Sequence, residues 1–172
     1  MKILITGANG YIGSRLAVAL ADEHEIVGLV RQVSGNRNGN LEFRMLGDIF
    51  EVQSADLGGI ECVIHTAGIA DASGYASDLQ RVNVDGSRAL AKACLESDVR
   101  RFINLSSIQA TGEGSGGPGS PEKPISAYGQ SKLAAEEAID EILGDSQIEA
   151  CHLRFPLVYG EWVENNFQML VK

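Results

Sequence analysis

Two side chains capable of acid/base chemistry, Tyr128 and Lys132, lie four residues apart in the segment SAYGQSKLAAEE. Good helix formers fill this stretch and predict a helix over 127–143, and four residues on a helix bring two side chains onto one face. A free tyrosine is a poor base at neutral pH because its pKa is about 10, but a nearby cation stabilises the phenolate. The spacing therefore predicts a proton carrier tuned by a lysine. The alternative is a half-buried tyrosine on a helix face, without chemistry.

A second chemical signal is the glycine-rich segment TGANGYIG, in which Gly7, Gly10 and Gly13 are spaced G-x-x-G-x-x-G. It follows an apolar run and opens a helical pattern. Such glycines permit a tight turn, leave the backbone bare for a pyrophosphate, and direct a helix N-terminus at its negative charge. The spacing departs from the usual G-x-G-x-x-G. We interpret the segment as a dinucleotide-binding turn; the alternative is a tight turn without a ligand.

The residue type at the end of the second apolar run bears on the choice of dinucleotide. An acidic residue there would bind the ribose 2′-hydroxyl of NAD. The chain has Arg31 instead, and a guanidinium suits a 2′-phosphate through charge-assisted hydrogen bonds. Arg31 therefore favours NADP over NAD, although it could also stack on the adenine or be a solvated arginine at a strand end.

The elements that must position these residues alternate between short apolar runs and amphipathic stretches. Strands are predicted at 2–6, 25–31, 41–46, 60–67, 100–107 and 148–154, and helices at 11–22, 78–97 and 127–143. Strands that alternate with helices imply right-handed crossovers. We therefore expect an α/β protein with a doubly wound parallel sheet, a Rossmann fold.

Composition narrows the possible partners. The 172 residues suit one domain, and the formal net charge of −9 argues against nucleic acid as a partner. No apolar stretch has the length of a membrane span, and the N-terminus lacks a signal-peptide core. Cys62, Cys94 and Cys151 lack metal-ligand spacing, so no metal is expected, and their apolar surroundings predict buried free thiols. A reducing, cytoplasmic location follows.

Seven motifs in order carry a family resemblance. They are TGANGYIG (6–13), GDI (47–49), HTAG (65–68), VNVDGS (82–87), LSSI (105–108), YGQSK (128–132) and LRFPLVYG (153–160). With them the chain resembles the N-terminal part of an extended short-chain dehydrogenase/reductase of the NAD-dependent epimerase/dehydratase group. Each motif alone is modest, but seven in the same order are specific.

The resemblance implies a role for each matching residue. Ser107 would bind the reacting oxygen, Tyr128 would be the general acid/base and Lys132 would hold the nicotinamide ribose, while Asn83 would support the site. The expected cofactor-binding residues, Arg31 included, are Gly7, Asn9, Gly10, Tyr11, Ile12, Gly13, Arg31, Asp48, Ile49, Ala67, Gly68, Tyr128, Lys132 and Phe155.

The implied activity is hydride transfer at C4 of a nucleotide-linked sugar. Epimerase and ketoreductase remain open: Thr111 stands where an epimerase motif has tyrosine, and NADP suits a reductase. A non-catalytic NADP(H)-binding module or sensor is the alternative. The resemblance divides the chain into a dinucleotide-binding domain, 1–160, and the start of a substrate-binding portion, 161–172, most of which is missing. It also implies a homodimer formed through the helices at 78–97 and 127–143.

Overall fold

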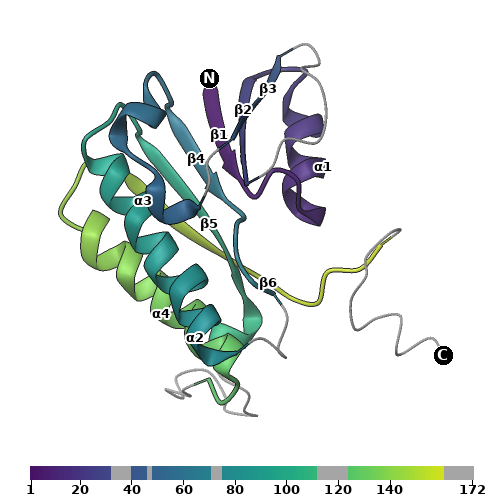
Figure 1. The fold of residues 1–172 in the computed structure, drawn as a ribbon, viewed down its shortest axis with the longest axis vertical. Coiled ribbons are helices and arrows are strands. Elements are labelled where there is room, and N and C mark those ends of the chain that lie inside the picture. Colours follow the sequence, from purple (N-terminus) through teal and green to yellow (C-terminus); the bar gives the residue numbers. More distant parts are fainter. Residues whose placement is uncertain (32–39, 46–47, 71–74, 112–123, 161–172) are drawn as a thin grey trace.

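The described part of the chain folds into a six-stranded parallel sheet with helices on both faces (Figure 1). The computed structural model describes residues 1–31, 40–45, 48–70, 75–111 and 124–160. The strands are β1 (Lys2–Thr6), β2 (Glu25–Val30), β3 (Leu41–Met45), β4 (Cys62–His65), β5 (Arg101–Ser107) and β6 (Glu149–Phe155). Their spatial order, β3-β2-β1-β4-β5-β6, reverses direction at β1. This is the doubly wound Rossmann order, so the expected fold class is confirmed.

Alternate residues of the central strands face two separate apolar layers. One layer packs Leu4 and Phe102 against the buried faces of α3 (Gly86–Leu95) and α4 (Ala127–Leu143). The other packs Ile5 and Ile64 against α1 (Tyr11–Leu20). In Figure 1, α3 and α4 accordingly lie side by side on the face opposite α1. Burial on both faces explains why these strands are almost continuously apolar.

The helix expected over 78–97 contains a change of helical type. It runs through α2 (Ala76–Leu79), a π-helical segment η3 (Gln80–Asp85) and α3. A π turn contains one more residue per hydrogen-bonded ring than an α turn, and such turns are frequent at functional sites. Here the segment contains the buried Asn83, which contacts the candidate site.

The last strand is less covered than the others. Most residues of β6 are exposed, and among them is Cys151. The expectation of three buried thiols is therefore wrong for Cys151, whereas Cys62 and Cys94 are buried. The reason is that, among the residues that the structure describes, β6 is an edge strand whose one neighbour is β5. The expected start of a substrate portion, 161–172, lies outside the described residues.

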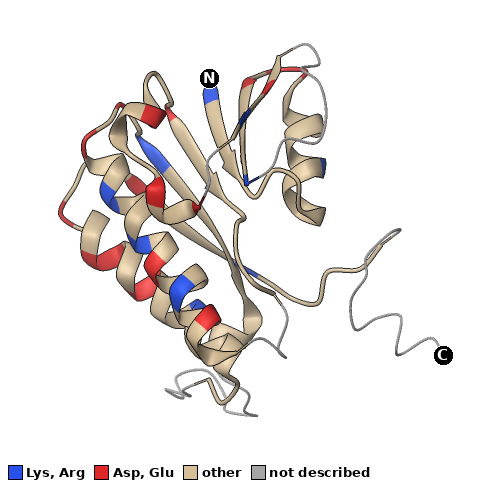
Figure 2. Cartoon of the chain, in the orientation of Figure 1, with Lys and Arg blue, Asp and Glu red and all other residues tan. Residues whose placement is uncertain are grey.

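Charged residues of both signs lie on the outer surface of the helix pair α3 and α4 (Figure 2). Arg88 of α3 and Glu141 of α4 form an ion pair across them at 3.1 Å. Within the described ranges, no helix combines the length and the apolar character needed to span a membrane.

Candidate functional site

The glycine-rich turn joins β1 to α1 at the carboxyl edge of the sheet. Gly7 has a φ of +66°, and a Cβ on it would lie 2.9 Å from the Ala67 backbone. Gly10 is the residue before the first helical position of α1, and among the described residues no side chain caps this end. The N–H groups of the first helical turn are thus left for another acceptor.

The loop after β4, Thr66–Ile69, lies against this turn. The Thr66 hydroxyl donates to the Thr6 carbonyl at 2.7 Å, and the Ala67 N–H donates to the Thr6 hydroxyl at 3.2 Å. Built on Gly13, a Cβ would collide with Gly7 and Thr66. The absence of side chains at these glycines therefore permits α1, β1 and the β4 loop to meet closely.

Two adjoining cavities open at this edge, and they share Gly10, Thr66, Gly68 and Ile69. The larger cavity, of about 380 Å³, contains most of the residues expected to do chemistry. It is lined by the predicted residues Gly10, Tyr11, Ile12, Gly13, Gly68, Ser107, Tyr128, Lys132 and Phe155. The second, of about 250 Å³, is lined by the predicted residues Gly7, Asn9, Gly10, Arg31, Asp48, Ile49, Ala67 and Gly68. The structure thus brings every residue of the predicted site to one of two neighbouring cavities.

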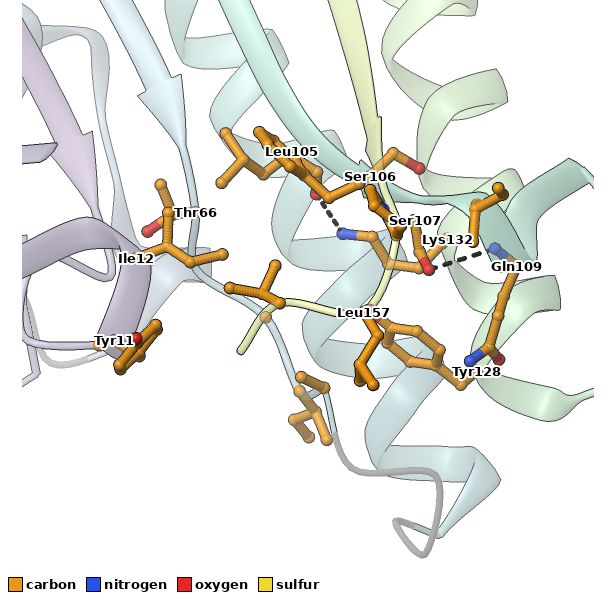
Figure 3. A pocket seen from close by; sticks show the side chains of 18 of the residues that line it. Tyr11, Ile12, Thr66, Leu105, Ser106, Ser107, Gln109, Tyr128, Lys132 and Leu157 are labelled. Atoms are coloured by element: carbon orange, nitrogen blue, oxygen red, sulfur yellow. Dashed lines mark hydrogen bonds between the residues drawn. The ribbon is translucent and has the colours of Figure 1, made fainter. Parts of the chain in front are cut away.

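Figure 3 shows how the larger cavity is built, with Tyr128 and Lys132 of α4 facing Tyr11 and Ile12 of α1 across it. Ser107 ends β5, and its hydroxyl accepts a hydrogen bond from the Gln109 N–H at 3.2 Å. The spacing of Tyr128 and Lys132 on one helix places both on the wall of the same cavity.

The start of α4 is held against the short turn that follows β5. Ser126 caps α4 by accepting from the Gly129 N–H at 3.0 Å, and its hydroxyl donates to Oε1 of Gln109 at 2.9 Å. A Cβ on Gly129 would lie 2.5 Å from the Gln109 carbonyl oxygen. These contacts fix the helical turn that carries Tyr128 relative to Ser107.

Asn83 connects α4 to the β4 loop from beneath. Its Oδ1 accepts from the Ile69 N–H at 2.8 Å, while its Nδ2 donates to the Ile69 carbonyl at 3.1 Å and to Ser131 Oγ at 3.0 Å. Ser131 Oγ in turn donates to the Tyr128 carbonyl at 2.8 Å. Asn83 thus links the β4 loop to the Tyr128 turn of α4, and its role in supporting the site stays a prediction.

Burial perturbs two titratable side chains of the cavity, Tyr128 and Lys132. It raises the pKa of Tyr128, while the neighbouring Ser107 hydroxyl acts in the opposite direction. Burial lowers the pKa of Lys132 to about 8, and the carboxylate of Glu136 partly offsets this. The Lys132 Nζ donates to the Leu105 carbonyl at 2.6 Å (Figure 3). One of the three donors of the ammonium is thus bound to a backbone oxygen, and the expected stabilisation of the phenolate by Lys132 stays a prediction.

The second cavity contains two guanidinium groups and one carboxylate. Arg31 is exposed at the end of β2, and Asp48 forms an ion pair with Arg81 at 3.5 Å. The Arg81 guanidinium also lies over the Phe50 ring, 5.1 Å from its centre. Arg81 was not among the predicted cavity residues, because it immediately precedes the VNVDGS motif and no local pattern marks it.

The paired cavities suit a dinucleotide on physical grounds. The bare glycine backbone and the uncapped helix N-terminus, where the cavities meet, suit a pyrophosphate. Apolar and charged groups in the second cavity suit the adenosine half of the dinucleotide. The larger cavity has room for the ring of the other half next to Tyr128. Groups of three or more potential metal ligands do not occur among the described residues.

Comparison with known proteins identifies relatives along nearly the whole chain. The UDP-glucose 4-epimerase of Vibrio cholerae is 34% identical over 188 residues, covering 99% of this chain and 56% of the relative. The structure of the UDP-glucuronic acid 4-epimerase from Bacillus cereus in complex with NAD has a TM-score of 0.81 and 28% identity, covering 93% of this chain and 57% of that one.

A further solved structure is MoeE5 in complex with UDP-glucose and NAD. It has a TM-score of 0.79 and 29% identity, covering 90% of this chain and 54% of that one. The chain thus spans about half the length of the relatives it matches.

The family model that matches is described as the NAD dependent epimerase/dehydratase family, and the match extends over residues 3–171. Together with the strand order, the glycine turn and the cavities at the carboxyl edge, this match establishes the family. The chain belongs to the NAD-dependent epimerase/dehydratase family, and the relatives named here include two UDP-sugar 4-epimerases.

Proposed function

We propose that this chain forms the cofactor-binding and catalytic part of an enzyme that transfers hydride at C4 of a nucleotide-linked sugar. The observation that carries the proposal is the shared cavity, where Ser107, Tyr128 and Lys132 form a wall opposite the N-terminus of α1. The relatives' names support the substrate class, since they include a UDP-glucose 4-epimerase and a protein in complex with UDP-glucose.

Tyr128 acts as the general acid/base in this proposal. Its phenol is half-buried with a raised pKa, so it is protonated at neutral pH and can donate to a sugar oxygen. Ser107 provides a second hydrogen bond to the same oxygen. The nicotinamide cofactor, when bound, supplies and receives the hydride.

Lys132 supplies the positive charge that makes the reverse proton transfer possible. A cation near the phenol stabilises the phenolate and lowers the pKa of Tyr128. Lys132 lines the same cavity as Tyr128, and its hydrogen bond to the Leu105 carbonyl uses one of its three donors. The lysine side chain has several rotatable bonds, so a change of rotamer can bring the ammonium closer to the phenol without a change in α4.

The dinucleotide is NAD or NADP. Both solved structures described above contain NAD, whereas the exposed Arg31 at the second cavity favours the 2′-phosphate of NADP. Calorimetric titration of wild type and Arg31→Ala with NADH and NADPH separates the two. A selective loss of NADPH affinity in Arg31→Ala supports NADP, and an equal change for both cofactors refutes the role of Arg31.

A Tyr128→Phe variant tests the catalytic role. It should bind NADH within about twofold of wild type and lose about 10²–10⁴ of the turnover of UDP-glucose. Tyr75→Phe is the matched control, because Tyr75 is exposed and lies in neither cavity. If Tyr128→Phe turns over within about tenfold of wild type, the acid/base assignment is wrong. Cofactor binding by wild type without turnover would instead make this chain a binding module.

The family resemblance also leads us to propose a homodimer through the outer faces of α3 and α4, the helices that carry the Arg88–Glu141 ion pair. Sedimentation equilibrium tests it directly. A dimer that dissociates in Leu95→Lys, where Leu95 is an exposed apolar residue of α3, would support this interface. A monomeric wild type at tens of micromolar would refute it.

A further inference from the structure

His65 ends β4 directly beneath the loop that separates the two cavities. Its ring is buried, with 2% of its surface exposed, and lines neither cavity. Nδ1 lies 2.7 Å from the Thr6 hydroxyl of β1, and Nε2 lies 2.9 Å from the Ser87 hydroxyl of α3. The imidazole thus bridges the sheet and the helical layer immediately behind the proposed cofactor site.

The neighbouring contacts determine which nitrogen carries the proton. Ser87 donates its single proton to the Asn83 carbonyl at 2.6 Å, and a carbonyl has no proton to give. The Ser87 oxygen therefore accepts from His65, which requires a proton on Nε2. In the neutral ring Nδ1 is then an acceptor, and it receives the Thr6 hydroxyl proton.

These hydrogen bonds form a chain, here called the relay, in which each group donates to the next in a single direction. It starts at the Ala67 N–H, which donates to Thr6 at 3.2 Å, and passes through His65 and Ser87 to the Asn83 carbonyl. Ala67 belongs to the loop that lines the second cavity, and Asn83 belongs to the π-helical segment. Asn83 also holds the other end of the same loop and, through Ser131, the Tyr128 turn of α4.

We propose that His65 is a positioning residue whose neutral, Nε2-protonated ring sets the β4 loop and the Asn83 turn in one fixed arrangement. The ring connects the cofactor side of the site, at Ala67, to the catalytic side, at Tyr128. The inference rests on the proposed function only in that the β4 loop is taken to contact the dinucleotide.

The electrostatic environment of the ring agrees with the neutral form. Burial lowers the pKa of His65 to about 3, and the nearby positive charge of Lys132 acts in the same direction. A protonated ring would donate from both nitrogens, so the Thr6 hydroxyl would lose its acceptor. The relay would then be interrupted between Thr6 and His65.

The first test is nuclear magnetic resonance on the isotopically labelled chain without cofactor. Long-range ¹⁵N–¹H correlations should show a proton on Nε2 of His65 and none on Nδ1, unchanged between about pH 8 and pH 5. The Asn83 side-chain amide should exchange slowly with solvent, because both of its polar atoms are hydrogen-bonded. A proton on Nδ1, or a ring that titrates in this range, would overturn the proposal.

Three substitutions separate the two halves of the relay. His65→Asn retains an acceptor for Thr6 and loses the donor to Ser87, so we expect faster exchange of the Asn83 amide with NADH affinity nearly retained. His65→Gln retains a donor for Ser87 and loses the acceptor for Thr6, so we expect the opposite pattern. His65→Phe fills the volume and loses both contacts, which should weaken NADH binding by at least about tenfold.

The control is Ser97→Ala, which removes two hydrogen bonds after the end of α3, to Cys94 and Val99, away from both cavities. It should lower stability and leave NADH binding unchanged. If His65→Phe binds NADH like this control, or if the Asn and Gln variants behave alike, His65 is an ordinary core residue. If wild type binds neither NADH nor NADPH, the proposed function fails, whereas the tautomer and the Asn83 exchange rates still decide whether the relay exists.

Discussion

Replacing Gly7 with alanine tests the close approach on which the cofactor site depends, and the chain contains a matched control. Gly7 and Gly59 both have a positive φ, +66° and +72°. A Cβ on Gly7 would lie 2.9 Å from the Cα and N of Ala67, whereas nothing lies within 4 Å of a Cβ on Gly59. The two substitutions therefore share the backbone strain and differ in the collision.

The expected magnitudes follow from that difference. A side chain in the left-handed region costs about 1–2 kcal/mol, part of which is offset because alanine restricts the unfolded chain. Gly59→Ala should thus lower the free energy of unfolding by about 1 kcal/mol. Gly7→Ala adds an overpacking cost of about 1–3 kcal/mol, since the nearest atoms are backbone and cannot rotate away. We expect a total loss of about 2–4 kcal/mol.

Urea unfolding measures these losses, and calorimetric titration with NADH measures their effect on the site. Gly7→Ala should weaken NADH binding at least about tenfold, because the collision displaces the β4 loop that lines both cavities. Gly59→Ala should bind NADH like wild type. Equal losses of stability in the two variants, or unchanged NADH binding in Gly7→Ala, would refute the argument that Gly7 is required for close packing.

Three further predictions concern titration and exposure. Because the pKa of His65 is about 3 in the folded chain and about 6.5 unfolded, the unfolded state binds more protons on acidification. On acidification from about pH 8 to about pH 4.5, the free energy of unfolding of wild type should therefore fall by about 2.7 kcal/mol more than that of His65→Phe. Urea unfolding measures both free energies, and equal decreases in the two proteins would contradict this. The pKa of Lys132 is about 8 in the folded chain, so near about pH 9 the unfolded chain holds a proton that the folded chain has lost. As the pH rises there, the free energy of unfolding of wild type should increase by about 1 kcal/mol per pH unit relative to that of Lys132→Met. Iodoacetamide on the native chain should label the exposed Cys151 and leave the buried Cys62 and Cys94 unmodified, as mass spectrometry would show; labelling of all three thiols would mean that the core opens readily.

The amino-acid sequence alone determined the order of strands and helices and the edge of the sheet at which the site lies. The glycine turn, Ser107 and the β4 loop each follow a predicted strand, and the carboxyl ends of parallel strands meet at one edge. Tyr128 and Lys132 join them because the helix that carries them begins near the same edge. These predictions succeeded because they depend on local periodicity and on a general rule of connection.

Only the tertiary structure decided the contacts between segments far apart in the chain. The hydrogen bonds of His65 to Thr6 and Ser87 join residues more than twenty positions apart, so no local pattern encodes them. The binding of Lys132 to the Leu105 carbonyl, the pairing of Arg81 with Asp48 and the exposure of Cys151 belong to the same class. The physical reason is that burial and hydrogen-bond partners depend on which elements pack together. An edge strand such as β6 can have the same apolar pattern as a buried strand and still be exposed.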